Sequence, residues 1–161
     1  ATLVITKTID EHNGITYISE PIKEETEISG LMTGKLAFIL NKRDVDLAVT
    51  LYEKMASGDY FLLTYHLGRA SYAKDRSKRQ LLKPGKRQQI DFRSERLVSR
   101  KLQPRSQLII VVQVIKQSDQ QINYGTGKDV SDETIADAGK PLEIQWSGNS
   151  YVEFPIWRAN E

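Results

Sequence analysis

The two histidines, His12 and His66, are the side chains of this chain best suited to act as a general base near neutral pH. His66 lies in "LLTYHLGRAS", beside threonine, tyrosine and serine residues, which raises the question of a catalytic triad. The local sequence places no Ser or Asp where it could pair with His66. A serine hydrolase of the α/β type also needs a Gly-x-Ser-x-Gly elbow. The closest stretch, "GNSYV" at 148–152, lacks the second glycine. No catalytic residue is therefore assigned to this chain.

Other site chemistries are also poorly represented. The chain has no cysteine, which excludes disulfides, a thiol nucleophile and cysteine zinc sites. With two histidines we expect no metal site and no cofactor. "GTGK" at 125–128 lacks the spacing of a phosphate-binding loop. Spacing alone leaves paired carboxylates for glycoside hydrolysis open, but the residue types favour a binding or structural module over a catalyst.

The basic side chains are concentrated in one stretch. The net charge is only +2, yet residues 74–105 hold twelve Lys/Arg against three acidic residues. Single-stranded nucleic acid usually requires aromatic platforms, and this stretch offers only Phe92. We therefore expect a solvated or domain-facing surface and no nucleic-acid partner. No apolar run is long enough to span a membrane.

Period-two alternation of apolar and polar residues dominates the chain and predicts strands. The clearest segments are 34–40, 46–54 and 60–68, and the apolar run 108–115 is typical of a strand covered on both faces. About ten short strands separated by turns, with no long amphipathic helix, predict an all-β sandwich. We expect residues 1–161 to form a single β-sandwich domain.

The strand around His66 has two distinct faces. Its odd positions, 61 to 67, are Phe, Leu, Tyr and Leu, which predicts that this face lies in the core. Thr64 and His66 would then share the opposite, polar face. This interpretation treats His66 as a histidine on the polar side of a half-buried sheet.

The C-terminal third contains loops and short strands. Residues 129–141 could hold one helical turn, with Ser131 as its cap and Gly139 as its stop. Two final strands are expected at 142–146 and 150–156. The glycines of the loop 123–127 permit close approach of another surface, and Tyr124 offers contact area.

Five segments, in order, resemble one known family. They are "YISEPIKEETEISG", "LAFILNKRDVDLAVTLYEK", "LLKPGKRQQIDF", "LQPRSQLIIVVQV" and the closing "INYGTGKDVSDETIADAGKPLEIQWSGNSYVEFPI". Together they are similar to the C-terminal domain of X-Pro dipeptidyl-peptidases and cocaine-esterase-like acyl hydrolases. The chain departs from the family pattern at Arg105-Ser106, where a Gly-His pair is usual, and in the basic link 93–102.

The resemblance implies a jelly-roll sandwich of the galactose-binding-like kind. In that family it packs against an α/β-hydrolase domain, N-terminal to this chain, which carries the Ser-Asp-His triad. This chain would then brace the catalytic domain and shape the substrate entrance or a homo-oligomer interface, without hydrolytic turnover of its own. The residues expected at an interdomain contact or the substrate rim are Thr64, His66, Asn123 and Tyr124.

Two alternatives remain open from the sequence. A free-standing carbohydrate-binding module would stack sugar rings on exposed aromatic side chains, for which there are seven candidates: Tyr17, Tyr52, Tyr72, Tyr124, Trp146, Tyr151 and Trp157. A nucleic-acid partner would use residues 74–105 and bind with strong salt dependence.

Overall fold

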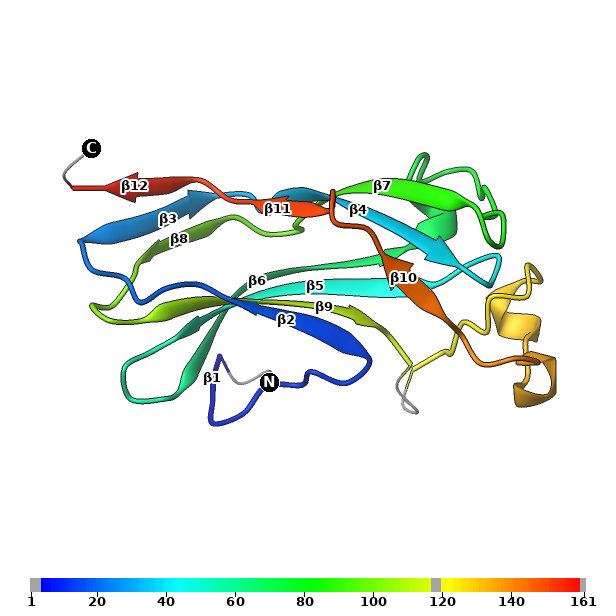
Figure 1. Ribbon diagram of the computed structural model, residues 1–161, viewed down its shortest axis with the longest axis horizontal. Helices are drawn as coiled ribbons and strands as arrows, with labels where there is room; N and C mark the ends of the chain where they lie inside the picture. The colour runs from blue at the N-terminus through cyan, green and yellow to red at the C-terminus, as the bar shows by residue number, and fades with distance from the viewer. Residues whose placement is uncertain (1–3, 117–119, 160–161) are drawn as a thin grey trace.

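The first layer of the fold is a five-stranded sheet. A computed structural model describes residues 4–116 and 120–159. The sheet forms the lower layer in Figure 1, and all its neighbouring strands are antiparallel. Its order is β1 (Ile5–Thr6), β6 (Tyr60–Arg69), β5 (Asp46–Lys54), β9 (Gln107–Val114) and β2 (Gly14–Ile18).

The second layer lies above the first and is built from two smaller sheets that follow one another along the long axis (Figure 1). One contains β10 (Ile144–Trp146), β4 (Thr33–Leu40), β11 (Tyr151–Glu153) and β7 (Arg87–Arg93). The other contains β12 (Ile156–Arg158), β3 (Thr26–Gly30) and β8 (Val98–Lys101). The expected all-β sandwich is confirmed, whereas its finer assignment as a galactose-binding-like jelly roll stays a prediction.

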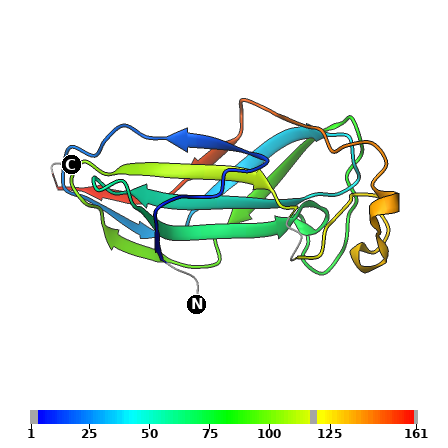
Figure 2. The same ribbon diagram turned by 90° about the horizontal axis from the view of Figure 1, so that it is seen from below.

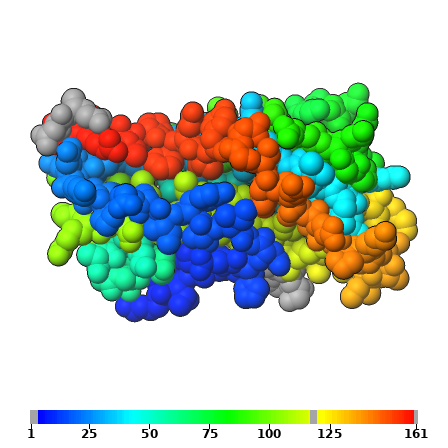
Figure 3. All heavy atoms as spheres, viewed as in Figure 1, coloured from blue at the N-terminus to red at the C-terminus, as the bar shows by residue number. Residues whose placement is uncertain are grey.

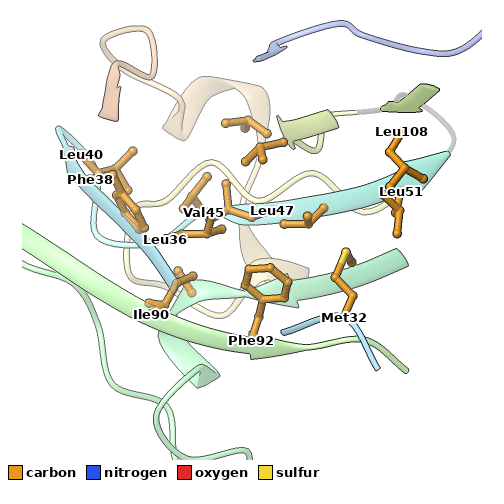
Figure 4. Close-up of a cluster of buried hydrophobic side chains, with 14 of the residues drawn as sticks. Met32, Leu36, Phe38, Leu40, Val45, Leu47, Leu51, Ile90, Phe92 and Leu108 are labelled. Atoms are coloured by element: carbon orange, nitrogen blue, oxygen red, sulfur yellow. The ribbon is translucent and has the colours of Figure 1, made fainter. Parts of the chain in front are cut away.

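The core lies between the layers and follows from the alternation in the strands. Leu36, Phe38 and Leu40 of β4 point inward and are at most 2% exposed. They face the inward side chains of β5 across the sandwich (Figure 4). Burial of each such side chain contributes roughly 1.5–3 kcal/mol, so these two strands hold the layers together.

The prediction for the two faces of β6 was right at Leu63, which packs against the core, and wrong from Thr64 to Leu67. Thr64 is buried and Leu67 is exposed, so Thr64 and His66 point into the sandwich. The pairing with β5 shifts register between Leu51 and Tyr52, and this bulge changes which residues of β6 face inward. His66 lies opposite Val49, a core residue of β5.

The outer face of the five-stranded sheet is also partly covered. Residues 7–13 cross this face between β1 and β2, as Figure 2 shows from below. Beneath this layer, Ile109 and Val111 of β9 are at most 1% exposed although they point away from the core. The prediction of a strand covered on both faces is confirmed for β9. Burial, and secondarily Asp10, raises the pKa of Tyr52 on the same face.

Four further expectations need correction. Residues 129–141 hold two short 3-10 turns, Val130–Asp132 and Ile135–Asp137, in place of one helical turn. The first is capped by the Asp129 carboxylate, which accepts the N–H of Ser131, so Ser131 is not the cap. The last expected strand is divided by Pro155 into β11 and β12, and β8 forms within the segment expected to be only a link.

Candidate functional site

One long side of the sandwich is closed by side chains of β6. The Thr64 hydroxyl donates to the carbonyl oxygen of Arg96 at 3.1 Å, and His66 Nδ1 donates to that of Arg93 at 3.1 Å. The His66 ring stacks on Phe92, with centroids 5.2 Å apart. Both predicted site residues therefore tie β6 to the end of β7 and the loop after it. These contacts therefore join the two layers along this side of the sandwich.

The environment of His66 predicts a pH dependence of stability. Burial lowers its pKa from 6.5, and Arg76 acts in the same direction, while the Arg93 hydrogen bond and Glu95 oppose them. Because the folded pKa lies below the unfolded one, the unfolded state binds more protons on acidification. The stability contributed by neutral His66 is present above pH 6.5 and is lost as the pH falls below it.

Urea unfolding at intervals between pH 7.5 and 5 would measure this slope. Glutamine at position 66 keeps a donor for the Arg93 carbonyl but does not titrate in this range, so the His66→Gln variant should lose most of the slope. A slope unchanged in His66→Gln would show that His66 is not its source.

The second pair of predicted site residues lies at one end of the sandwich, where residues 120–140 cap the strands. Asn123 is buried. Its side-chain Nδ2 donates to the Asp46 carboxylate at 2.9 Å, and its side-chain Oδ1 accepts the N–H of Gly125 at 2.9 Å. Gly125 has φ 72°, and a Cβ there would lie 2.5 Å from the Asp44 carbonyl oxygen. This glycine therefore permits close contact within the domain, and the chain folds tightly against Asp44.

Tyr124 lies beside Asn123 but is only partly buried. Its backbone N–H donates to the Glu133 carboxylate at 2.6 Å, and Lys116 Nζ lies 5.9 Å from its ring centroid. Thr126 donates to the same carboxylate through both its backbone and its hydroxyl. The structure thus groups the four predicted residues into two pairs in different places: Thr64 with His66, and Asn123 with Tyr124.

The end cap also depends on a buried carboxylate that the sequence analysis missed. Asp44 is fully buried and accepts the backbone N–H and the hydroxyl of Ser71 at 2.9 and 2.7 Å. Arg79 lies 3.5 Å from the same carboxylate and donates to the carbonyl of Lys128 at 2.7 Å. This cluster joins three loops, and no local sequence motif marks it.

The opposite long side of the sandwich is open. Here the edge of β2 faces the edge formed by β10, β11 and β12, and no strand bridges the two layers among the described residues. Two adjoining cavities of about 720 and 500 Å³ lie between these edges and share Tyr17 and Ile110. We call this hollow the furrow; its lining includes Tyr17, Ile18, Ile110, Trp146, Tyr151 and Ile156.

Figure 3 faces the furrow. The blue atoms of β2 and the red and orange atoms of the C-terminal strands form its two banks, and yellow-green atoms of the β8–β9 region show between them. Among the described residues, eleven large apolar side chains are exposed, and four of these line the furrow: Tyr17, Ile18, Tyr151 and Ile156. A contiguous apolar hollow of this kind is typical of an interaction surface.

The basic stretch 74–105 does not form one free surface. Arg79 and Arg100 pair with the buried carboxylates of Asp44 and Glu53, and Arg76 and Lys101 pair with Glu95 and Glu25. Across residues 4–116 and 120–159, no group of three or more His, Asp or Glu could hold a metal ion. Within the same residues, no helix is long and apolar enough to cross a membrane.

Comparison with known families decides the assignment. Residues 2–95, more than half of the chain, match the model of the X-Pro dipeptidyl-peptidase C-terminal non-catalytic domain. The chain belongs to this family. The resemblance drawn from the five sequence segments is confirmed. The family match contains the first three of these segments, and the last two lie beyond residue 95.

Solved structures share the fold of this X-Pro dipeptidyl-peptidase C-terminal domain. An aminopeptidase from a marine sediment Thaumarchaeota archaeon is 17% identical, with a TM-score of 0.80 over 90% of this chain and 26% of its own. An α-amino acid ester hydrolase is 21% identical, with a TM-score of 0.75 over 90% of this chain and 26% of its own. A CocE/NonD family hydrolase from Staphylococcus aureus is 16% identical, with a TM-score of 0.62 over 92% of this chain and 31% of its own.

The comparisons with solved structures show a shared fold and how much of each solved protein this chain covers. The chain spans only about a quarter to a third of the length of these solved hydrolases. No curated protein matches it. At these identities the comparison shows the shared sandwich alone, so the roles of Thr64, His66, Asn123 and Tyr124 in this X-Pro dipeptidyl-peptidase C-terminal domain stay predictions.

Proposed function

We propose that this chain is the non-catalytic sandwich of a longer serine hydrolase and braces an α/β-hydrolase domain through the furrow. The parent activity would be hydrolysis of an ester, an amide or an Xaa-Pro dipeptide. The observation that carries the proposal is the asymmetry of the sandwich. One long side is closed by Thr64 and His66, whereas the other presents two sheet edges with an apolar hollow between them.

Physical chemistry supports the furrow as the docking face. Exposed apolar area gains free energy when another surface removes it from water, and interface cores are enriched in aromatic side chains. Tyr17, at 56% exposed, and Tyr151, at 47%, supply that area on the two banks. Ile156, at 37% exposed, adds apolar area on the bank formed by β12. Domain interfaces within a chain use surfaces of this kind.

The residues predicted from sequence have a narrower role in this proposal. The Thr64 hydroxyl, the His66 Nδ1 and the Asn123 amide all bond within the domain. They would therefore act by fixing the shape of the domain. Tyr124, which is partly exposed at the end cap, is the one we propose as a direct contact at the substrate entrance.

A matched pair of isoleucine variants tests the docking face. In the longer hydrolase, Ile156→Asp places a charge in the furrow and should separate the unfolding of the sandwich from that of the catalytic domain. Ile135→Asp places the same charge in the end cap, outside the furrow, where Ile135 is already 81% exposed. Scanning calorimetry should show two transitions for Ile156→Asp and one cooperative transition for Ile135→Asp and the wild type.

The 161-residue chain serves as the control for folding. Ile156 is partly exposed, so Ile156→Asp should change the melting temperature of this chain little compared with its effect in the longer protein. If the two aspartate variants behave alike in the longer hydrolase, the furrow is not the docking face.

The alternative of a carbohydrate-binding module stays a prediction. Of the seven aromatic candidates, Tyr17, Tyr151 and Trp157 are exposed, and Tyr17 and Tyr151 line the furrow. Trp146 packs edge-on against Phe38 of the core, with centroids 5.7 Å apart. The exposed rings would suit either a sugar or a protein surface, and the family assignment favours the protein.

A further inference from the structure

The strand on one bank of the furrow, β2, has a free main-chain edge. It is the last strand of the five-stranded sheet and, among residues 4–116 and 120–159, pairs only with β9. The N–H of Val114 donates to the carbonyl of Asn13, and the N–H of Ser19 donates to the carbonyl of Leu108. Antiparallel pairing uses alternate residues, so residues 13, 15, 17 and 19 bond to β9. The N–H and C=O groups of Thr16 and Ile18 consequently point away from the sheet.

The sequence of β2 does nothing to protect this edge. Its five residues are "GITYI", without charge or proline, and its pairing with β9 contains no bulge. Natural edge strands are usually guarded by charges, proline, bulges or shortness. The other edges of this fold are guarded in these ways. β7 carries Arg87, Asp91 and Arg93, and β8 carries Arg100 and Lys101. β12 follows Pro155, β1 has two residues, and β10 and β11 have three each.

We propose that β2 accepts an extended segment of the hydrolase domain as a sixth strand, in addition to the apolar contact in the furrow. This inference rests on the proposed function and specifies how the two domains join. The new strand would exchange hydrogen bonds with Thr16 and Ile18. Its apolar side chains, at every second position, would enter the furrow beside Tyr17, and its other side chains would face solvent beside Ile18.

We infer that the added strand comes from the same polypeptide, because the solved hydrolases with this fold are much longer than this chain. The solved hydrolases that share this fold are three to four times as long as the chain, so most of each lies outside the sandwich. A segment of that remainder is present at high effective concentration and needs no separate encounter. The two banks leave cavities of about 720 and 500 Å³, which provide space for the side chains of an added strand.

Hydrogen exchange tests strand addition directly. In the 161-residue chain, the amides of Ile15 and Tyr17 should be protected by β9, and those of Thr16 and Ile18 should exchange rapidly. In the longer hydrolase, the amides of Thr16 and Ile18 should slow by at least about tenfold. Unchanged exchange at these two amides in the longer protein would overturn the inference. Protection in the short chain that grows with its concentration would also overturn it, because a second copy would then occupy the edge.

A proline variant provides the second measurement. Thr16→Pro removes the outward N–H and leaves the bonds to β9 in place, and edge strands tolerate proline in this position. In the longer hydrolase, Thr16→Pro should separate the two calorimetric transitions, whereas Thr16→Ala should not. If Ile156→Asp separates the domains while Thr16→Pro does not, strand addition fails and the proposed function stands. If neither variant separates them, both fail. The exchange measurement on the wild type decides the matter even if Thr16→Pro does not fold.

Discussion

Replacing Asp44 with alanine is expected to lower the free energy of unfolding by about 3–5 kcal/mol, as is typical when one member of a buried charge pair is removed. The carboxylate is fully buried and accepts the backbone N–H groups of Val45 and Ser71, each at 2.9 Å, and the Ser71 hydroxyl. Alanine leaves these donors and Arg79 without their acceptor inside the protein. Urea unfolding of the 161-residue chain measures the loss.

Asp75 offers a matched control for Asp44. Its carboxylate accepts the backbone N–H and the hydroxyl of Ser77 at 2.8 and 2.7 Å, which is the same pair of bonds that Asp44 makes with Ser71. Asp75 lies at the surface, where water replaces a lost acceptor. Asp75→Ala should therefore cost far less than Asp44→Ala. Equal losses would show that burial of the Asp44 cluster does not matter.

The Asp44 cluster also connects stability to the end cap. Arg79 joins Asp44 to the carbonyl of Lys128, and the N–H of Arg43 donates to the carbonyl of Gly125. Loss of the carboxylate should loosen the loop that presents Tyr124. The entrance contact proposed for Tyr124 therefore depends on a charge buried behind it.

The positions of the main strands were predictable from the sequence alone. The alternation in 46–54 gives β5 its observed bounds, Asp46–Lys54, and 34–40 differs from β4 by one residue. A half-buried strand must alternate, because successive side chains point to opposite faces. The family resemblance came from a different signal, the order of five sequence segments that are similar to those of the family.

The inward face of β6 from Thr64 to Leu67 was not predictable, because two non-local features decide it. The bulge against β5 depends on how the strands pair, and the cover over the outer face comes from residues 7–13. Apolar side chains at Tyr65 and Leu67 suggested a core face, although they point outward. The open side of the sandwich could not be predicted either, because the strand order of the whole sheet decides which strands lie at its edges.

Of the two fully buried carboxylates, Glu53 could be predicted to be buried from the sequence, and Asp44 could not. The alternation Leu47, Val49, Leu51 continues to Glu53, so the pattern that defines the core face also places this carboxylate on it. Asp44 lies in a loop between strands, and its partners Ser71 and Arg79 come from a later segment. Only the folded chain brings them together.

Glu53→Ala is the second substitution expected to be severe, at about 3–5 kcal/mol for a fully buried member of an ion pair. One carboxylate oxygen of Glu53 accepts from Arg100 Nε at 2.5 Å, and the other accepts the N–H of Gln103 at 2.7 Å. Arg100 also lies over the ring of Phe61, with its guanidinium carbon 3.6 Å from the centroid. Alanine would leave the guanidinium without its counter-charge between the layers. Guanidinium chloride unfolding measures the loss.

Two controls test whether the isolated charge of Arg100 causes the loss of stability in Glu53→Ala. One is an exposed ion pair, and the other is a double variant. Glu25 pairs with Lys101, the residue after Arg100, but both side chains are exposed, so Glu25→Ala should change stability little. Replacing both partners, the buried Glu53 and the partly buried Arg100, as Glu53→Leu with Arg100→Met, removes the isolated charge and should recover much of the stability lost in Glu53→Ala. If the double variant is no more stable than Glu53→Ala, the cost arises from the Gln103 bond and the packing around Phe61. In that case the unpaired charge of Arg100 would not be the source of the instability.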